Sequence, residues 1–394
     1  MIQHLRIAMI AACPFPAARG TPIRIQRIAD ALSRRGHDVN VFTYHLGSSG
    51  AHPFQIFRIP AVRTYQREAP GPNYQKLLLL DPLLAIKLVR SLRASRYDLI
   101  HAHHAEGLLT ALPSRWLFRM PLVYDVHTLL ESELPYYPLG LPRRLLARIG
   151  RAMDRSLPAR SDHVIAVSDT IRAALEKTCT SRGIEISVIP NGVEEEFFAA
   201  GMDRAVERNA SAPNMVFAGN LAAYQGIESL LRAFAFARRA QPNLRLRILT
   251  DDSFDAYEPL ANELGIRDGI NIARVGLPEL PRELAAADVA VNPRSDCTGL
   301  PQKLLNYMAS GCPIVSFPSS TRHIAHERNC LLVEDRDESG LARAILRLLE
   351  HPELAHQLGS AARACARAEF GWDQTAGRIE QVYEGVLQAR RKAI

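Results

Sequence analysis

The stretch LRIAMIAA, residues 5–12, starts an alternation that decides the fold, and HDVNVFTY, residues 37–44, repeats it. Both runs are short and largely apolar, and a helical pattern from about Pro22 to Arg35 separates them. Short apolar strands joined by helices of ten or more residues are typical of a parallel sheet that is covered on both faces. The pattern therefore predicts a doubly wound α/β domain.

The same pattern continues through the first half of the chain and then restarts. Further strands of the first sheet are predicted at residues 54–60, 98–104, 121–127, 163–168 and 186–190. A polar stretch, residues 201–213, interrupts the pattern, and strands follow again at 215–220, 244–251, 270–276, 289–293 and 312–317. We place the boundary near Ala205, so that residues 1–205 and 206–371 form two Rossmann-like domains facing a central cleft.

Length and composition narrow the class of protein. The chain has 394 residues, which suits two domains of average size. The N-terminal apolar run is short and strand-like and lacks the cleavage site of a signal peptide, and no window is apolar enough to span a bilayer. The six cysteines lack the C-x-x-C spacing of zinc or redox sites. These features predict a cytoplasmic protein with reduced thiols.

Several functional classes are disfavoured by missing motifs. The net charge of +7 is modest for this length and accompanies no nucleic-acid-binding motif. The turns after the first strand of each half read CPFPAARGT and GNLAAYQG, so neither carries G-x-G-x-x-G, and the Walker pattern is missing too. A dinucleotide-dependent dehydrogenase and a P-loop enzyme are therefore poor interpretations.

Candidate site residues of the first half follow its strands. Gly20 and Thr21 end the loop after the first strand, where a glycine and a helix N-terminus suit close approach of a ligand, although a plain connecting turn explains them equally well. His127 lies at the carboxyl end of a predicted strand, yet a lone histidine is more often structural. His101, His103 and His104 could ligate a metal, but no matching carboxylate spacing accompanies them, so we predict no metal site.

The second half offers CTGLPQKLLNYMASGCPIVSF, residues 297–317. Gly299, Leu300 and Pro301 lead into a helix predicted from Gln302 to Ser310, which Gly311 ends. Unpaired N–H groups and the positive dipole end at such a helix start suit a diphosphate, and Lys303 adds a charge in the first turn.

Taken together, these stretches resemble the family 4 retaining glycosyltransferases of the GT-B fold. The resemblance rests on RRGHDVNVFTY, VYDVHT, VIPNGVEEEFF, FAGNLAAYQGIESLLRAF, LAAADVAVNPR, LLNYMASGCPIVSF and GWDQTAGRIEQVYEGVL, in this order. It implies transfer of a sugar from a nucleotide diphosphate sugar of the UDP or GDP type, with retained anomeric configuration, no cofactor and no obligatory metal. The nucleotide would bind the second domain, the acceptor the first, and a last helix, residues 372–394, would cross back to the first domain.

The resemblance also assigns residues, and several depart from the family pattern. His127 aligns with a histidine that contacts the transferred sugar. Thr298 and Asn306 stand where family members carry two glutamates, and Asp296 could replace the first of them if the loop shifts. Asn220 and Gln225 stand where the family has an arginine and a lysine that grip phosphate, and Arg24 replaces a histidine; Arg24, Arg294 and Lys303 are the cations that could compensate.

The candidate acceptor domain contains a basic amphipathic helix. Residues 141–160 hold six arginines against one aspartate, with Leu145, Leu146 and Ile149 at helical spacing. Such a helix can lie on an anionic bilayer, although each such helix alone is better explained as a surface helix with its apolar face in the core. An aromatic-proline loop, residues 134–140, also looks suited to a lipid or sugar. We therefore expect a lipid, lipid-linked glycan or other glycan acceptor and peripheral attachment to the cytoplasmic face of the inner membrane.

Three alternatives stay open at this point. A glycosyltransferase with a soluble small-molecule acceptor is the nearest. A non-catalytic nucleotide-sugar binding protein would explain the replaced residues Asn220, Gln225, Thr298 and Asn306. A GT-B sugar epimerase should show several acidic groups around the sugar, and none stand at the matching positions.

Overall fold

The computed structural model describes residues 4–17, 20–48, 50–67, 75–136, 140–201, 212–295, 301–318 and 324–392. It divides into two compact units, one of Met1–Asn191 with Trp372–Ile394 and one of Gly192–Gly371. The division falls after Asn191 and not near Ala205. The reason is α7 (Glu195–Ala200), which buries Phe197 and Phe198 in the core of the second unit.

The first unit is built on a seven-stranded sheet with the order β3-β2-β1-β4-β5-β6-β7, in which every pair of neighbours is parallel. All seven strands stand where the sequence predicts them. Their bounds are β1 Arg6–Ala11, β2 Asp38–Thr43, β3 Gln55–Arg58, β4 Leu99–His103, β5 Leu122–Val126, β6 His163–Ala166 and β7 Glu185–Val188.

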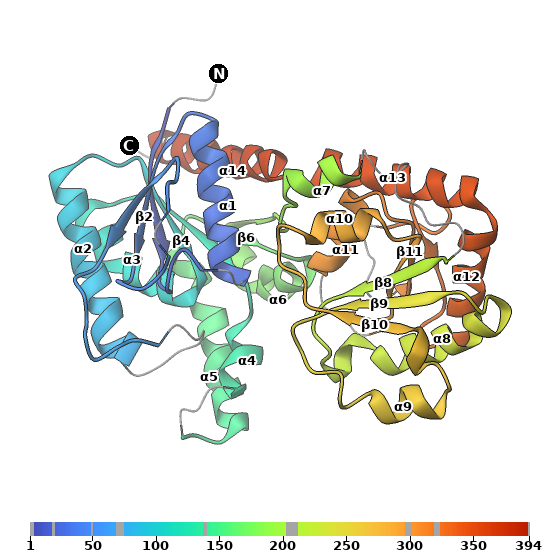
Figure 1. The fold of residues 1–394 in the computed structure, drawn as a ribbon. Coiled ribbons are helices and arrows are strands. Elements are labelled where there is room, and N and C mark those ends of the chain that lie inside the picture. Colours follow the sequence, from blue (N-terminus) through green and yellow to red (C-terminus); the bar gives the residue numbers. More distant parts are fainter. Residues whose placement is uncertain are drawn as a thin grey trace. The chain divides into compact units, whose positions relative to one another are not determined.

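Successive side chains of β1 point to opposite faces of this sheet, so each face has its own core. Ile7 and Met9 pack in one core with α1 (Gly20–Arg34) and the last helix, α14 (Trp372–Lys392). Ala8 and Ile10 pack in the other core with α2 (Asp81–Ala94) and α3 (His104–Phe118). Figure 1 shows these helices on either side of the strands. The remaining helices of the unit are α4 Leu130–Glu133, α5 Arg143–Ser156 and α6 Asp169–Thr180.

The second unit repeats this architecture with a six-stranded parallel sheet, order β10-β9-β8-β11-β12-β13. Five of its strands were predicted; the sixth, β13, has only two residues and was not predicted. The bounds are β8 Asn214–Ala218, β9 Arg245–Leu249, β10 Ile270–Ala273, β11 Val289–Asn292, β12 Ile314–Ser316 and β13 Leu331–Leu332.

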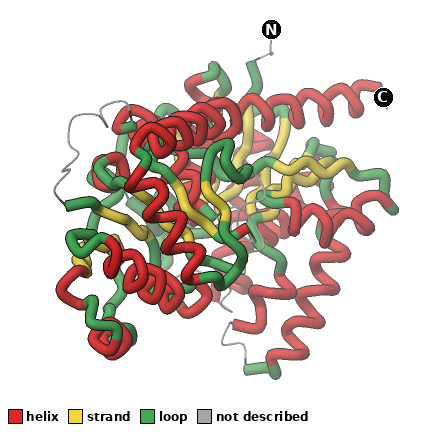
Figure 2. Tube along the Cα trace, turned by 90° about the vertical axis from the view of Figure 1, so that its right-hand side faces the viewer, coloured by secondary structure: helices red, strands yellow, loops and turns green. Residues whose placement is uncertain are grey.

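Two cores again cover the two faces, since Met215 and Phe217 of β8 pack in one and Val216 and Ala218 in the other. Helices surround the strands in both units (Figure 2). Those of the second unit, besides α7, are α8 Ile227–Ala240, α9 Glu258–Glu263, α10 Leu280–Ala285, α11 Gln302–Ala309, α12 Glu338–Glu350 and α13 Pro352–Phe370. Two doubly wound sheets are thus confirmed, and no helix in the described part of the chain is long and apolar enough to span a membrane.

Candidate functional site

The carboxyl ends of β4 and β5 bring several titratable side chains of the first unit together. The register of this parallel pair sets His103 opposite Asp125, and both side chains are fully buried. His127 lies directly after the last residue of β5, which confirms the predicted position at a strand end. His104, the first residue of α3, has a φ of 64°, an uncommon conformation for a residue with a side chain.

Asp125 forms a buried ion pair with Arg24 of α1. The guanidinium Nε donates to Oδ2 at 3.0 Å and Nη2 donates to Oδ1 at 3.3 Å. Its other N–H groups donate to the carbonyls of Ile189 and Pro190 and to the side chain of Asn191. The prediction that Arg24 could compensate in a diphosphate site therefore needs correction: its donors are occupied inside the first unit.

Burial alone would raise the pKa of Asp125, but the Arg24 charge and hydrogen bonds from neighbouring imidazoles hold it well below its usual range. The carboxylate is therefore ionised. We call Asp125, Arg24, His101, His103 and His127 the Asp125 cluster.

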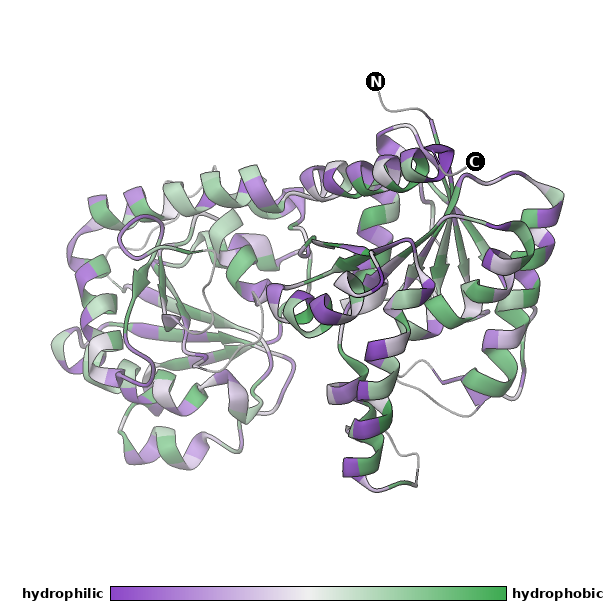
Figure 3. Ribbon diagram, turned by 180° about the vertical axis from the view of Figure 1, so that it is seen from behind, coloured by the Kyte–Doolittle hydropathy of each residue, from purple (hydrophilic) through white to green (hydrophobic). Residues whose placement is uncertain are grey.

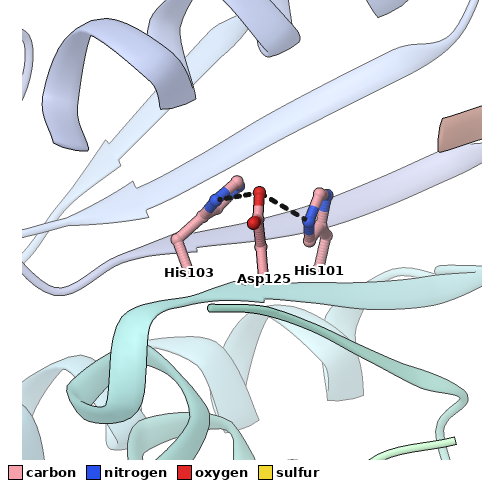
Figure 4. Close-up of side chains that lie close together, drawn as sticks. All are labelled: His101, His103 and Asp125. Carbon is pink, nitrogen blue, oxygen red and sulfur yellow. Dashed lines mark ion pairs between the residues drawn. The ribbon is translucent and has the colours of Figure 1, made fainter. Parts of the chain in front are cut away.

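Figure 4 shows His101 and His103 directed at Asp125. Their nearest nitrogens lie 3.8 and 3.3 Å from Oδ2. Burial lowers the pKa of both histidines, so both rings are neutral at pH 7. Burial also raises the pKa of Tyr383 of α14, so its hydroxyl stays protonated, and this hydroxyl lies 2.7 Å from His101 Nδ1. A ring proton on Nε2, which faces the ionised Asp125, leaves Nδ1 to accept from this hydroxyl.

His101, His103 and Asp125 place one ligand atom each within 4.8 Å of one another, a spacing that could hold a metal ion. The Arg24 guanidinium, however, already occupies both oxygens of Asp125. A divalent ion there would lie against a buried cation that cannot be deprotonated in proteins. The donor set therefore fits an internal ion pair surrounded by neutral imidazoles better than a metal centre.

His127 joins the Asp125 cluster to the start of α1. Its Nε2 lies 3.3 Å from His103 Nδ1 and 3.7 Å from Asp125 Oδ2, and its Nδ1 lies 3.1 Å from the hydroxyl of Thr21. Burial lowers the pKa of His127 to about 4, although the charge of Asp125 opposes this. The ring is neutral near pH 7 and has an oriented hydrogen-bond donor and acceptor.

A pocket of about 180 Å³ opens beside this cluster. Gly20, Thr21 and Cys13 line it along the start of α1 and the end of β1. The charged side chains in its wall are Lys76, His104, Glu106 and Glu133. We call it the His104 pocket.

His104 connects the carboxylates of this pocket. Its Nδ1 lies 2.6 Å from Glu106 and its Nε2 lies 3.1 Å from Glu133. Burial opposes protonation, but the two carboxylates outweigh it and raise the pKa of His104 to about 10. Burial would likewise raise the pKa of Glu106, yet His104 and Lys76 lower it to about 2. His104 and Glu106 are therefore both charged at neutral pH.

In the second unit, α11 begins at Gln302, and Pro301 at its N-cap provides no side-chain cap. The bounds confirm the predicted helix to within one residue, and Gly311 after it has a positive φ of 63°. Lys303 Nζ donates to Gln225 Oε1 at 2.8 Å, and Gln225 Nε2 donates to Asn220 Oδ1 at 3.2 Å.

This hydrogen-bonded chain continues to a second cation. Asn220 Nδ2 donates to the Tyr224 hydroxyl at 3.1 Å, and the Arg294 guanidinium lies 4.7 Å from the centre of the Tyr224 ring. Gly226 closes the same turn with a φ of 75°, where a Cβ atom would lie 2.1 Å from the Pro293 carbonyl oxygen. We call Lys303, Gln225, Asn220, Tyr224 and Arg294 the Lys303 cluster.

Asn306 lies one turn further along α11 and is 8% exposed. Its Oδ1 accepts from Gln302 Nε2 at 3.3 Å, and the same nitrogen of Gln302 donates to the Gly192 carbonyl at 3.0 Å. The candidate residues Asp296, Thr298, Gly299 and Leu300 lie outside the described residues, as do the middle positions of the 134–140 loop.

Sequence reasoning did not find the roles of Lys76, Glu106, Glu133 and Asp125. Asp125 precedes His127 by two residues, and Glu106 follows His104 by two, so both stand near histidines already noted. Their partners come from distant segments, however, and Arg24 is 101 residues from Asp125. No local spacing signals such a pair.

Comparison with known proteins agrees with this fold. Residues 18–197 match the family described as Glycosyltransferase Family 4, and residues 212–351 match Glycosyl transferases group 1. The chain is 28% identical to a D-inositol 3-phosphate glycosyltransferase of Kineococcus radiotolerans, over 98% of this chain and 96% of that protein. A protein of the same name from Acidothermus cellulolyticus is 29% identical, over 98% and 92%.

Solved structures with the same fold cover nearly the whole chain. Sucrose-phosphate synthase from Thermosynechococcus elongatus has a TM-score of 0.74 and 21% identity, with 98% of this chain and 100% of that chain covered. HepE from Anabaena, solved in complex with UDP-glucose, has a TM-score of 0.66 and 18% identity, with 97% and 100% covered. At these identities the likeness establishes the fold.

Proposed function

This chain belongs to glycosyltransferase family 4, with the GT-B fold, and we propose that this retaining enzyme moves a sugar from a UDP or GDP sugar to a hydroxyl group of a small polar acceptor. The His104 pocket carries the acceptor part of this proposal. At about 180 Å³ it is smaller than the roughly 300–1,000 Å³ typical of pockets for drug-sized ligands. The relatives named D-inositol 3-phosphate glycosyltransferases, which span nearly the whole chain, support an acceptor of this size.

We propose that the donor nucleotide binds the second unit at the start of α11. The N–H groups and the dipole of a helix start favour phosphate, and Lys303 supplies a full positive charge in the first turn. Its contact with Gln225 supports the idea that Lys303 takes over from the lysine that Gln225 replaces. Arg294, on the ring of Tyr224, is a second cation at the other end of the same cluster. Asn306 would offer a neutral hydrogen bond to a ribose hydroxyl.

The chemistry then requires stabilisation of charge more than a strong nucleophile. Breaking the bond between sugar and phosphate leaves an anionic diphosphate and an electron-poor sugar carbon. In our proposal Lys303 and the α11 N-terminus, together with Gly299 to Pro301, stabilise the leaving diphosphate. In the first unit, Gly20 and Thr21 leave room for close approach of a ligand, and neutral His127 directs a hydrogen bond to a sugar hydroxyl. Asp296 and Thr298 remain candidates for contacts to the sugar.

Product formation tests this proposal. The purified protein is incubated with UDP-glucose or a GDP sugar and a panel of cyclitols and monosaccharides, without added metal, and products are identified by mass and by the anomeric coupling constant. We expect one donor to yield a product with retained configuration. Donor that stays intact with every acceptor, despite bound nucleotide, would favour a non-catalytic binding protein.

A lipid-linked acceptor is the second candidate, and α5 is the observation that favours it. Leu145 and Ile149 lie one turn apart on α5 and are 42% and 38% exposed, and Leu141, two residues before the helix, is 47% exposed. Only Leu146 and Gly150 of this helix are buried. Figure 3 shows α5 projecting from its sheet with alternating purple and green segments. The predicted basic amphipathic helix thus exists and keeps part of its apolar face outside the core.

Vesicle binding distinguishes the two candidates. If α5 attaches the enzyme to a membrane, changing Arg143, Arg144 and Arg148 to glutamine should weaken binding to anionic vesicles at low salt, and the difference should fade at high salt. Changing Arg232, Arg239 and Arg343 of the second unit to glutamine provides the control for lost charge. Absence of binding by the unchanged protein would favour the small soluble acceptor.

A further inference from the structure

The cations of the His104 pocket are already paired with carboxylates. Lys76 Nζ lies 3.8 Å from Glu106, and His104 lies between Glu106 and Glu133 at 2.6 and 3.1 Å. The Lys76 side chain is 6% exposed and that of His104 is 16% exposed, so both pairs are largely screened from water. The raised pKa of His104 and the lowered pKa of Glu106 keep this pair charged, and each cation of the pocket has a carboxylate within 3.8 Å.

A further carboxylate, Asp81, lies behind the side chains that line the pocket. Lys76 Nζ is 5.7 Å from the centre of the Tyr44 ring, and the Tyr44 hydroxyl donates to Asp81. The Thr128 hydroxyl binds both His104 and Glu133, so the second carboxylate is held in place from two sides. Among the described residues that line the pocket, Lys76 and His104 are the only cations, and each faces a carboxylate.

This arrangement disfavours an anionic ligand. A phosphate monoester that approached Lys76 or His104 would also approach Glu106 and Glu133, and the like charges would repel in a site of low dielectric. It would have to separate existing ion pairs in order to bind. A neutral hydroxyl group can instead donate to a carboxylate that remains paired, and a ring with several hydroxyls can do so at several points.

We infer that the His104 pocket selects a neutral polyhydroxylated acceptor, such as an unphosphorylated cyclitol or sugar, and that Glu106 and Glu133 determine this selectivity by pairing the cations that would otherwise bind phosphate. The inference rests on the proposed function, in which this pocket receives the acceptor. A preference for a neutral acceptor distinguishes this chain from the relatives whose names specify a phosphorylated inositol.

Matched pairs of compounds test the selectivity directly. Binding of myo-inositol and D-myo-inositol 3-phosphate, and of glucose and glucose 6-phosphate, is measured by saturation-transfer NMR and calorimetry in the presence of a nucleoside diphosphate. We expect the neutral member of at least one pair to bind at least tenfold more tightly. Tighter binding of the phosphorylated member of both pairs, or no binding of any of the four compounds, would overturn the inference.

Variants then identify the residues responsible. Replacing Glu106 and Glu133 together by glutamine keeps their shape and removes the two negative charges that face Lys76 and His104. The preference should shift toward the phosphorylated member by at least tenfold. The control changes Glu263 and Glu350, two exposed residues of the second unit, to glutamine, and should leave the preference unchanged. An unchanged preference in the pocket variant, with a normal melting curve, would contradict the assignment.

The proposed function and the inferred selectivity can each fail without the other. If the wild-type protein transfers sugar preferentially to phosphorylated acceptors, the inference is wrong and the enzyme activity stands. If neutral polyols bind in the pocket but no donor and acceptor combination yields a product, the selectivity stands and the transferase proposal is wrong.

Discussion

The two units share one architecture but place different chemistry at the carboxyl ends of their strands. The Asp125 cluster of the first unit consists of a buried ion pair and three histidines, and the His104 pocket beside it adds two glutamates. The Lys303 cluster of the second unit consists of two amides, a tyrosine and two cations. The first unit therefore contains groups that can move or orient protons, while the second offers positive charge and neutral hydrogen bonds.

This difference explains how one fold could serve two substrates. Neutral amides and a lysine suit a diphosphate, whose charge does not need to change during binding. Oriented imidazoles and paired carboxylates suit the hydroxyl groups of sugars, which both donate and accept hydrogen bonds. Each of the following predictions tests one side of this comparison, beginning with the largest expected effect.

Replacing Asp125 by asparagine should destabilise the first unit by about 3–5 kcal/mol, because Arg24 would remain buried without its counter-charge. The matched change in the second unit, Ser316→Ala, removes a buried neutral hydrogen bond from Asn292 and should cost about 1–3 kcal/mol. Denaturant-dependent hydrogen exchange reports the free energy of unfolding for each unit separately. Equal losses would show that the buried charge of Asp125 stabilises its unit no more than a buried neutral hydrogen bond does.

Replacing His127 by alanine should lower turnover about 100-fold, the lower end of the range for a positioned hydrogen-bonding or proton-transferring group. Nucleotide affinity should stay within a few-fold, since the nucleotide is proposed to bind the second unit. The measurements are steady-state kinetics and calorimetry on the same preparation. Unchanged turnover would remove His127 from the mechanism, and a large loss of nucleotide affinity would contradict its assignment to the sugar.

Replacing Lys303 by methionine should weaken binding of the nucleoside diphosphate by about 1.5–3 kcal/mol, which is roughly 10- to 150-fold, because one charge-assisted contact is lost. Lys87→Met in α2 of the first unit is the control for loss of a lysine charge. An affinity within threefold of wild type would show that other cations bind the diphosphate, and Arg294 would be the next residue to replace.

Stability should depend on pH in opposite directions for two histidines of the first unit. The pKa of folded His104 is about 10, above the ordinary 6.5, so its stabilising contribution is full below pH 6.5 and is lost as pH rises toward 10. The pKa of folded His127 is about 4, so its contribution is full above pH 6.5 and stability falls as pH drops toward 4.

Melting curves of the wild type and of His104→Gln across pH 5–10 check the first of these contributions. The wild type should lose stability on the alkaline side, and the variant should lose less. A change of 1 kcal/mol corresponds to a shift in Tm of about 2–4 °C for a unit of this size. Identical alkaline slopes in the two proteins would show that His104 is not the group responsible.

Sequence patterns predicted the strands well because apolar runs and helical spacing are local. They placed His127 at its strand end and α11 within one residue. The domain boundary was placed too late, because Phe197 and Phe198 look like part of the first unit until their core is seen. The Asp125 cluster could not be predicted, since its members come from α1, β4 and the end of β5 and meet only through the fold of the first unit.

Calorimetric titration with UDP, GDP and ADP, first without and then with divalent metal, tests the central claim most directly. The account predicts that one nucleotide binds saturably without metal, that His127→Ala retains this binding and that Lys303→Met weakens it at least tenfold. Absence of binding by all three nucleotides under both conditions, from a protein with a normal melting curve, would contradict the claim that the second unit holds a nucleotide sugar.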